Sequence, residues 1–407
     1  RDGSSTFGEN NKWANFPSIA VGWNFAEESF IKNWIGHWMN RGKVRVSYGT
    51  SGQIFGNEYL AYGLLTNADG VNFNGNAGMA AADGISPDLT WEKSKQYDLG
   101  LDIDLLESHV QMKLDYYYKY SSSLIYAVPA PGDMYGYLEY IQNAMEVSNE
   151  GLELELTYEA LRNTAVTWRT KLNASRNWNR FEKSYDNRDK AQLVIGQSLY
   201  QIYVYDDDGY YTSENEVPTY YKTTGEKTYL GGISTNKGVS GLVGTQKLRD
   251  LDSDGNINYA LKDRYPAASP LPLVYGGWVN EIRWKNLDLN ILFNYTLGRH
   301  IVNQNRATLS SGGTLYLDYR DIRFYGQSEN PNYPRLGTEY NINVRSAIEK
   351  VNHVSLKQIT LGYDFPKKWF TGRWKFSGAR LFVTGENLFY LSNYSGLNPE
   401  VVDVYTG

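Results

Sequence analysis

The 407-residue sequence contains no cysteine, which excludes disulfide bonds, thiolate metal sites and cysteine nucleophiles. It also lacks an apolar run of about 18 residues, the length that a membrane-spanning helix needs. The mean hydropathy is -0.52. A helical membrane protein is therefore excluded. A membrane β-barrel is not, because lipid-facing and water-facing residues alternate along its strands and cancel in an average.

Basic residues are not in excess either. The formal net charge is -5 and the isoelectric point is near 5.6, and no basic cluster occurs along the chain. Because non-specific binding of nucleic acid depends on a basic field, we expect no nucleic-acid partner.

Enzyme signatures are also missing. The four histidines, His37, His109, His300 and His353, are dispersed. The sequence has no HExxH motif, nucleophile elbow, phosphate-binding loop or GxGxxG motif. We therefore expect no catalytic residue and no enzyme activity.

What the sequence does contain is a two-residue alternation of apolar and polar side chains. A clear example is the segment 96–104, where Tyr97, Leu99 and Leu101 alternate with Asp98, Gly100 and Asp102. This period is typical of a β-strand with two different faces. It recurs ten times, in the segments 16–25, 43–49, 96–104, 110–120, 152–158, 166–172, 274–284, 287–295, 359–365 and 379–383.

The connections between these strands alternate between short and long. The short ones are expected at 26–42, 105–109, 160–164, 285–286 and 366–377, and the long ones at 52–90, 121–147, 184–272 and 300–350. Outer-membrane barrels have short turns at one end and long loops at the other. Five tryptophans also lie in or beside the short turns, as an interfacial aromatic belt requires: Trp34, Trp38, Trp284, Trp369 and Trp374. The pattern favours a transmembrane antiparallel β-barrel over a soluble β-sheet protein.

Ten strands in an open sheet leave two unpaired edges, which the bilayer does not tolerate. If the chain forms a barrel, we therefore expect it to hold only part of that barrel.

Several stretches resemble the SusC/RagA family of TonB-dependent outer-membrane transporters, and they follow one another in the family's order. The matching stretches are Asn11–Trp13, Phe16–Ser18, Ala26–Phe30, Arg45–Gly52, Pro87–Glu92, Tyr97–Asp102, Asp115–Lys119, Asn149–Leu154, Gly385–Phe389 and Asn398–Val401.

The resemblance implies a barrel of about 22 strands, with a plug ahead of it. Residues 1–407 would then be the C-terminal part of the barrel, without the plug, the first barrel half and the final strand. The implied function is active import of oligosaccharides or peptides across the outer membrane. The implied partners are a SusD-like surface lipoprotein, the TonB complex and outer-membrane lipid. Two alternatives stay open: an outer-membrane barrel without active transport, as an adhesin or secretion-linked anchor, and a soluble carbohydrate-binding module.

One segment resembles a calcium-binding loop. Oxygen-bearing side chains occupy alternate positions and a glycine occupies the sixth, as an EF-hand-type loop requires. The candidate ligands are Asp250, Asp252, Asp254, Asn256 and Asn258. The twelfth position, where a bidentate acid belongs, is Leu261, and the next acid is Asp263. A structural calcium ion is the one cofactor we consider, and an Asx-rich turn is the alternative.

Tyrosines gather in the longest expected loop. Aromatic rings at such positions either stack on sugars or contact a partner, or they pack the loop itself. The candidate contacts for substrate or lid are Tyr203, Tyr205, Tyr210, Tyr211, Tyr220 and Tyr221.

Overall fold

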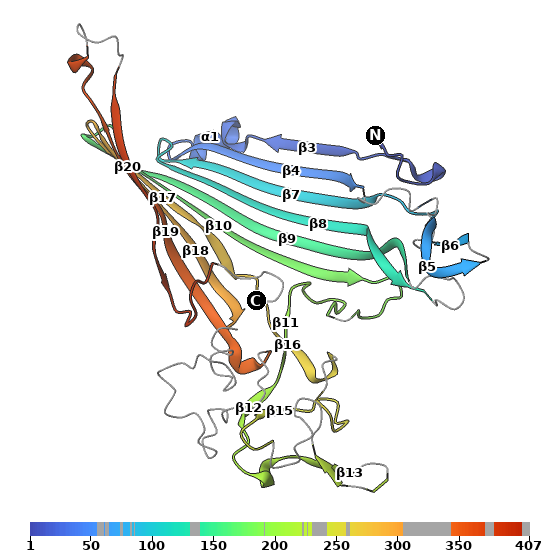
Figure 1. Ribbon diagram of the computed structural model, residues 1–407. Helices are drawn as coiled ribbons and strands as arrows, with labels where there is room; N and C mark the ends of the chain where they lie inside the picture. Colours follow the sequence, from blue (N-terminus) through green and yellow to red (C-terminus); the bar gives the residue numbers. More distant parts are fainter. Residues whose placement is uncertain are drawn as a thin grey trace. The chain divides into compact units, whose positions relative to one another are not determined.

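A computed structural model describes residues 1–54, 61, 65–73, 76–81, 84, 86–130, 139–190, 192–221, 224–225, 227–229, 242–257, 261–303, 343–370 and 378–400. Ten long strands form one sheet in the order β20-β19-β18-β17-β10-β9-β8-β7-β4-β3 (Figure 1). Their bounds are β3 Ser18–Trp23, β4 Met39–Gln53, β7 Glu92–Leu105, β8 Val110–Pro129, β9 Glu139–Leu161, β10 Val166–Lys183, β17 Val274–Trp284, β18 Leu287–Val302, β19 Ile348–Asp364 and β20 Arg380–Ser392. These are the ten strands that the alternation predicts.

The remaining elements are short. Paired strands are β1 Asp2–Gly3 with β2 Trp13–Ala14, β5 Leu65–Phe73 with β6 Asn76–Ala81, β11 Ile202–Tyr205 with β16 Arg264–Ala268, β12 Asp207–Tyr210 with β15 Gln246–Leu248, and β13 Thr219–Tyr221 with β14 Lys227–Tyr229. The helices are α1 Ser29–Ile35 and the 3₁₀ turns η1 Glu9–Asn11, η2 Phe25–Glu27, η3 Glu214–Glu216, η4 Leu261–Asp263, η5 Arg345–Ala347 and η6 Lys367–Trp369. Among the described residues, no helix combines the length and the apolar character needed to cross a bilayer.

The chain divides into two compact units. The first comprises 1–199, 276–292 and 358–386, and the second comprises 200–275, 293–357 and 387–407. The first unit holds the short turns and most of the long sheet.

Consecutive strands in the first unit pair in antiparallel register. Each ladder from β3 to β10 is antiparallel, and in the β7–β8 ladder Leu101 faces Leu114 while Asp102 faces Lys113. Apolar side chains therefore lie opposite apolar ones, and polar side chains lie opposite polar ones. We call the side that carries Leu99 and Leu101 the apolar face, and the side that carries Asp98 and Asp102 the polar face.

No described residue covers the large side chains of the apolar face that follow. Exposed fractions are 65% for Ile19, 64% for Val21, 51% for Val46 and 50% for Leu99. In water, a contiguous apolar surface of this extent promotes aggregation. In a bilayer, such a surface is stable against the lipid hydrocarbon. The exposure of these large side chains therefore supports the prediction of a membrane-facing surface.

The short turns are tight and several of their residues adopt a left-handed backbone. Residues 106–109 join β7 to β8, and Lys285 and Asn286 alone join β17 to β18. Lys285 has a φ of 53° and Asn163, in the β9–β10 turn, a φ of 56°. Left-handed residues suit two-residue hairpin turns because their twist matches that of the strands.

One predicted connection, 121–147, is wrong. The strands β8 and β9 continue to Pro129 and Glu139, so that only 130–138 separate them. The three consecutive serines Ser121 to Ser123 interrupt the apolar–polar alternation, so the sequence pattern does not predict that the strand continues beyond them. The register shifts after Ser121, and Ser123 has a φ of 59°, so a bulge absorbs the interruption while pairing resumes at Leu124.

The long connection 184–272 is also more ordered than a loop. It contains strands β11 to β16, and its residues contribute to a separate hydrophobic core in the second unit. That core consists of Ile202, Val204, Tyr205, Leu248, Ile257, Val302, Val344 and Ala347. The second unit thus has a hydrophobic core of its own, built from segments that the sequence pattern marks only as polar connections.

On the polar face an arginine reaches across a glycine to an aspartate two strands away. Arg45 on β4 donates to Asp102 on β7 (Nε to Oδ2, 3.1 Å) and to Asp115 on β8 (Nη2 to Oδ1, 2.7 Å). Gly100 on β7 lies beneath the guanidinium: a Cβ there would lie 2.5 Å from Arg45 Cζ and 2.5 Å from Asp115 Oδ1.

The same device occurs a second time in the first unit. Arg380 on β20 donates to Asp288 on β18 at 2.6 Å, and Gly362 on β19 lies beneath it, where a Cβ would lie 2.4 Å from Arg380 Nη2. In both places the missing side chain leaves room for the bridging arginine. We call the two arrangements the arginine–glycine bridges.

Replacing Gly100 by alanine is expected to destabilise the barrel by about 1–3 kcal/mol, because the added carbon displaces the guanidinium from Asp115. Gly49→Ala is the matched control, since a Cβ at Gly49 meets only Ser18 Cβ at an ordinary 3.5 Å. The measurement is the temperature at which the folded band of the full-length protein is lost on a heat-modifiability gel. Equal transitions for the two variants would contradict this role for Gly100.

Candidate functional site

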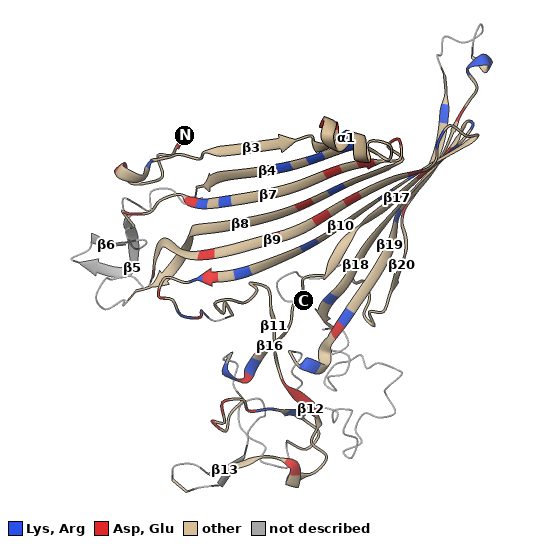
Figure 2. Ribbon diagram, turned by 180° about the vertical axis from the view of Figure 1, so that it is seen from behind, with Lys and Arg blue, Asp and Glu red and all other residues tan. Residues whose placement is uncertain are grey.

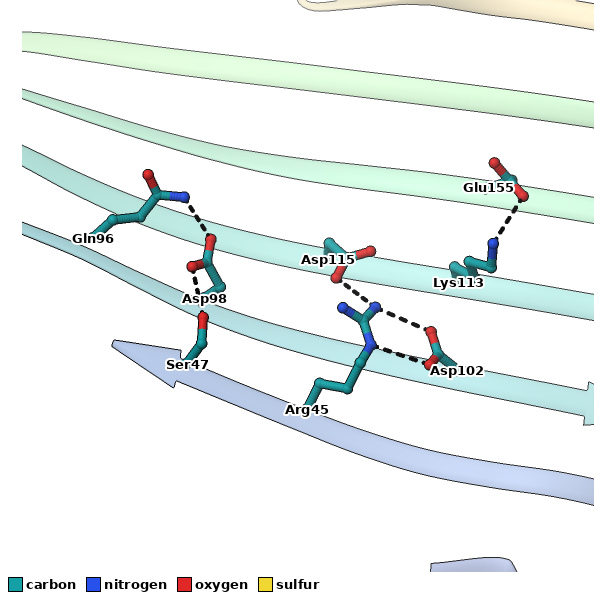
Figure 3. A network of polar contacts seen from close by, with 8 residues as sticks. All are labelled: Arg45, Ser47, Gln96, Asp98, Asp102, Lys113, Asp115 and Glu155. Carbon is teal, nitrogen blue, oxygen red and sulfur yellow. Dashed lines mark hydrogen bonds and ion pairs between the residues drawn. The ribbon is translucent and has the colours of Figure 1, made fainter. Parts of the chain in front are cut away.

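The polar face of the first unit is the first candidate site. Oppositely charged residues intermingle along β4, β7, β8 and β9 (Figure 2). Besides the Arg45 bridge, Glu155 on β9 accepts from Lys113 at 3.4 Å and pairs with Lys171 at 3.1 Å. Asp98 accepts from the Ser47 hydroxyl and from the Gln96 amide, both at 2.8 Å (Figure 3).

These contacts pair Arg45, Lys113 and Lys171 with carboxylates of the same wall. Asp102 is nearly buried and is held by two nitrogens of Arg45. Such a carboxylate is a poor nucleophile, because both of its oxygens already accept hydrogen bonds from the guanidinium. The geometry therefore builds a hydrophilic wall rather than a reactive centre.

The wall is hollowed near the short turns. A pocket of about 490 Å³ lies between β9, β10, β17, β18 and β20. Its charged lining residues are Glu159, Arg162, Arg169, Glu281, Arg283, Asp288 and Arg380. Arg380 is bound to Asp288 and Asp364, and Arg162 pairs with Glu159 at 3.3 Å. No ion pair involves Arg169 within the described part of the chain, so its charge is available to an occupant of this pocket.

The acidic loop in the second unit is the second candidate site. Ligand oxygens of Asp250, Asp252 and Asp254 lie within 4.8 Å of one another. The loop turns on Gly255, whose φ is 84° and whose N–H donates to Asp250 Oδ2 at 2.8 Å. Asn256 also belongs to this turn, through its N–H to Asp254 Oδ1 at 2.8 Å. Asn258, the fifth candidate ligand, lies outside the described residues.

A further acidic residue, Asp263, contacts this loop. The 3₁₀ turn η4 brings Asp263 back, fully buried, to accept the N–H of Leu251 at 3.2 Å. Meanwhile Asp250 Oδ1 is buried with no hydrogen-bond partner among the described residues. An orphaned carboxylate oxygen in a cluster of acids fits a hard cation.

Tyr220 packs against the same loop. Burial, followed by a hydrogen bond to Asp250, raises the pKa of Tyr220 to about 12. A Cβ on Gly255 would lie 3.2 Å from the ring. Tyr220 therefore remains protonated at neutral pH and sits beside the acidic oxygens.

The other candidate tyrosines divide by exposure. Tyr205, Tyr210 and Tyr211 are buried, with exposed fractions of 1%, 9% and 5%. Burial raises the pKa of Tyr211 to about 12. These three rings pack the second unit and leave little surface for a ligand. Tyr203 is half-buried on β11, whereas Tyr221 on β13 is 74% exposed and is the ring best placed to meet a partner.

Sequence reasoning missed the arginine–glycine bridges. Gly100 and Gly362 could have been noticed in the sequence, because each is a glycine on the polar face of a strand. A larger side chain at such a position would simply face solvent, so a glycine there suggests that a neighbouring group needs the space. The partners, however, lie on flanking strands, and only the folded structure shows that Arg380 and Asp288 meet over Gly362.

Comparison with known proteins agrees with this architecture. A sequence model of the family described as "TonB dependent receptor-like, beta-barrel" matches residues 1–395. TonB-dependent receptor P3 of Formosa agariphila is 31% identical over 98% of the chain, and TonB-dependent receptor SusC of Bacteroides thetaiotaomicron is 24% identical over 98%. The chain spans about 40% of the length of these curated relatives.

A solved structure shares the fold. The RagAB peptide importer in its closed-closed state superposes with a TM-score of 0.77 at 22% identity, covering 98% of this chain and 42% of the importer chain. These comparisons confirm the predicted family resemblance, the antiparallel barrel fold and the outer-membrane location. They also agree with the prediction that the chain is not an enzyme, since the relatives are named as receptors. The chain belongs to the TonB-dependent receptor-like β-barrel family, of whose barrel it is a fragment.

Proposed function

We propose that this chain is part of the barrel wall of a TonB-dependent importer, one that takes up oligosaccharides or peptides together with a SusD-like surface lipoprotein. The observation that carries the proposal is the contrast between the two faces of one sheet. One face is an apolar surface that no described residue covers, and the other is a hydrophilic wall on which charges of both signs intermingle and several are paired with one another.

A wall of paired charges suits transport of large polar solutes. Because Arg45, Lys113 and Lys171 are each held by carboxylates, the wall offers hydrogen-bonding groups without a strong field of one sign. A polar solute can form hydrogen bonds with such a surface without binding to it tightly. A glycan and a zwitterionic peptide both meet this description, and the fold neighbour RagAB is a peptide importer.

In this proposal the ten strands are consecutive strands of a larger barrel. The edges β3 and β20 pair with strands contributed by the rest of the protein, which also supplies the plug that the TonB complex pulls. Residues 1–407 are then the C-terminal part of the barrel. A barrel without active transport is the competing function.

Uptake by the full-length protein tests the proposal. Deleting the gene is expected to abolish growth on one class of substrate, oligosaccharide or peptide, offered as the sole carbon source, and a protonophore is expected to stop uptake in the wild type. Affinity purification in detergent is expected to recover a surface lipoprotein. Uptake that survives loss of the TonB complex would favour the passive barrel.

The exposed tyrosine Tyr221 offers a residue-level test of lid or substrate contact. Tyr221→Ala is expected to weaken lipoprotein recovery or substrate binding by about tenfold, the loss that truncation of a tyrosine hot spot produces. Tyr97→Ala is the control, because Tyr97 lies on the apolar face and is 52% exposed. An unchanged affinity in the Tyr221 variant, or an equal loss in both, removes Tyr221 from the contact surface.

We further propose that the acidic loop binds a structural calcium ion. Asp250, Asp252 and Asp254 would supply side-chain oxygens, and Asp263 would take the part of the closing acid that Leu261 does not provide. Lys262 pairs with Asp252 at 3.5 Å and partly neutralises the loop in the metal-free state. The ion would tie η4 to the turn at Gly255.

Terbium luminescence tests the calcium proposal, because Tyr220 beside Asp250 can transfer excitation to a bound lanthanide. The full-length protein is expected to show tyrosine-sensitised emission that excess calcium suppresses. Asp252→Asn combined with Asp254→Asn should abolish it, whereas Asp208→Asn, in an acidic run without the alternate spacing, should leave it intact. Absence of emission at millimolar terbium would sink the idea.

A further inference from the structure

Cationic side chains collect on the apolar face at the end of the strands opposite the short turns. Residues on this face alternate along β7, so Lys93 and Lys95 share the side of Tyr97 and Leu99, and all four are exposed. Arg180 on β10 is exposed as well, and its register places it on the same face. Figure 2 shows basic residues in these end portions of β7 and β10.

The register arranges the apolar face in rows. The row nearest the short turns contains Leu105, Val110, Tyr158 and Thr170. The two rows after it are purely apolar: Ile103, Met112, Leu156 and Leu172, then Leu101, Leu114, Leu154 and Ala174. The next two rows bring in aromatic and polar groups: Leu99, Tyr116, Leu152 and Arg176, then Tyr97, Tyr118, Glu150 and Trp178. The following row contains Lys95, Tyr120, Ser148 and Arg180.

The height of the last row matches the far surface of a membrane. Lys95 lies ten residues along β7 from Leu105, which begins the strand pair at the short turn, and a tilted barrel strand needs about 9 to 11 residues to cross. Aromatic residues occupy the row beneath, as in an interfacial girdle. Since long loops mark the external end of such barrels, the cations lie at the headgroups of the outer leaflet.

The acids of this region are already engaged. Glu150 accepts from Tyr116 at 3.1 Å, Glu182 accepts from Ser148 at 2.5 Å, and Glu146 accepts from Tyr120 and pairs with Lys183 at 3.8 Å.

The cations differ in this respect. Arg176 lies over the Trp178 ring at 4.5 Å, which holds the guanidinium at the girdle. Lys93, Lys95 and Arg180 have no ion-pair partner in the described ranges of the chain. An exposed cation that borders an apolar band is complementary to an anionic headgroup.

We propose that Lys93, Lys95 and Arg180 form a binding site for the phosphate groups of the phosphorylated glycolipid of the outer leaflet. Strands β7 and β10 are three strand spacings apart, about 14 Å, so the site spans the width of one large headgroup rather than a single phosphate. The tyrosine row supplies the apolar floor beneath it. The assignment rests on the membrane location of the barrel and not on its transport activity.

The test uses the full-length protein in detergent with three probes: diphosphorylated lipid A, its dephosphorylated form, and vesicles of phosphatidylglycerol. Wild-type protein is expected to retain diphosphorylated lipid A in native mass spectrometry. The triple variant Lys93→Gln, Lys95→Gln, Arg180→Gln is expected to bind it about tenfold more weakly.

The control is Lys119→Gln, which removes a cation at similar height on the polar face, where Lys119 faces Gln96 and Asn149. This variant is expected to bind lipid A as the wild type does, and heat-modifiability gels verify that each variant is folded. Undiminished binding by the triple variant overturns the proposal. Equal binding of the dephosphorylated lipid, or of phosphatidylglycerol, also overturns it.

Discussion

Within a bilayer every backbone N–H and C=O must find its partner in the protein, because hydrocarbon offers none. In this chain the continuous antiparallel ladders from β3 to β10 meet that requirement. Pairing in register forces side chains to alternate between the two sides of the sheet. Every other feature of the first unit, from the bare apolar face to the paired charges, follows from this alternation.

The alternation also explains why glycine matters in the wall. Strands about 4.8 Å apart crowd long side chains on the polar face, and an arginine that bridges three strands must lie flat over the middle one. Gly100 and Gly362 make that possible. The polar face thus carries the ion-paired arginines, while the apolar side chains nearer the short turns are left to contact lipid.

Much of the sheet was predictable from the sequence, because a period of two is a local signal. The segment from Tyr97 to Asp104 reveals both its strand and its faces. The failures have physical reasons. Ser121 to Ser123 break the alternation, yet a bulge preserves pairing. Tyr205 looks like a loop aromatic, but Val302 and Val344, distant in sequence, bury it. Asp263 joins the acidic loop only because η4 turns the chain back.

The central claim is that Leu99 and Leu101 face lipid while Gln96 and Asp98 face the water-filled interior. Single cysteines at these four positions, introduced into the full-length protein without other accessible thiols, test it directly in the outer membrane. The segment itself has no cysteine to interfere. A membrane-impermeant, water-soluble maleimide small enough to enter the barrel should label Gln96→Cys and Asp98→Cys and spare Leu99→Cys and Leu101→Cys. Equal labelling at all four positions, or the reverse pattern, would contradict the account.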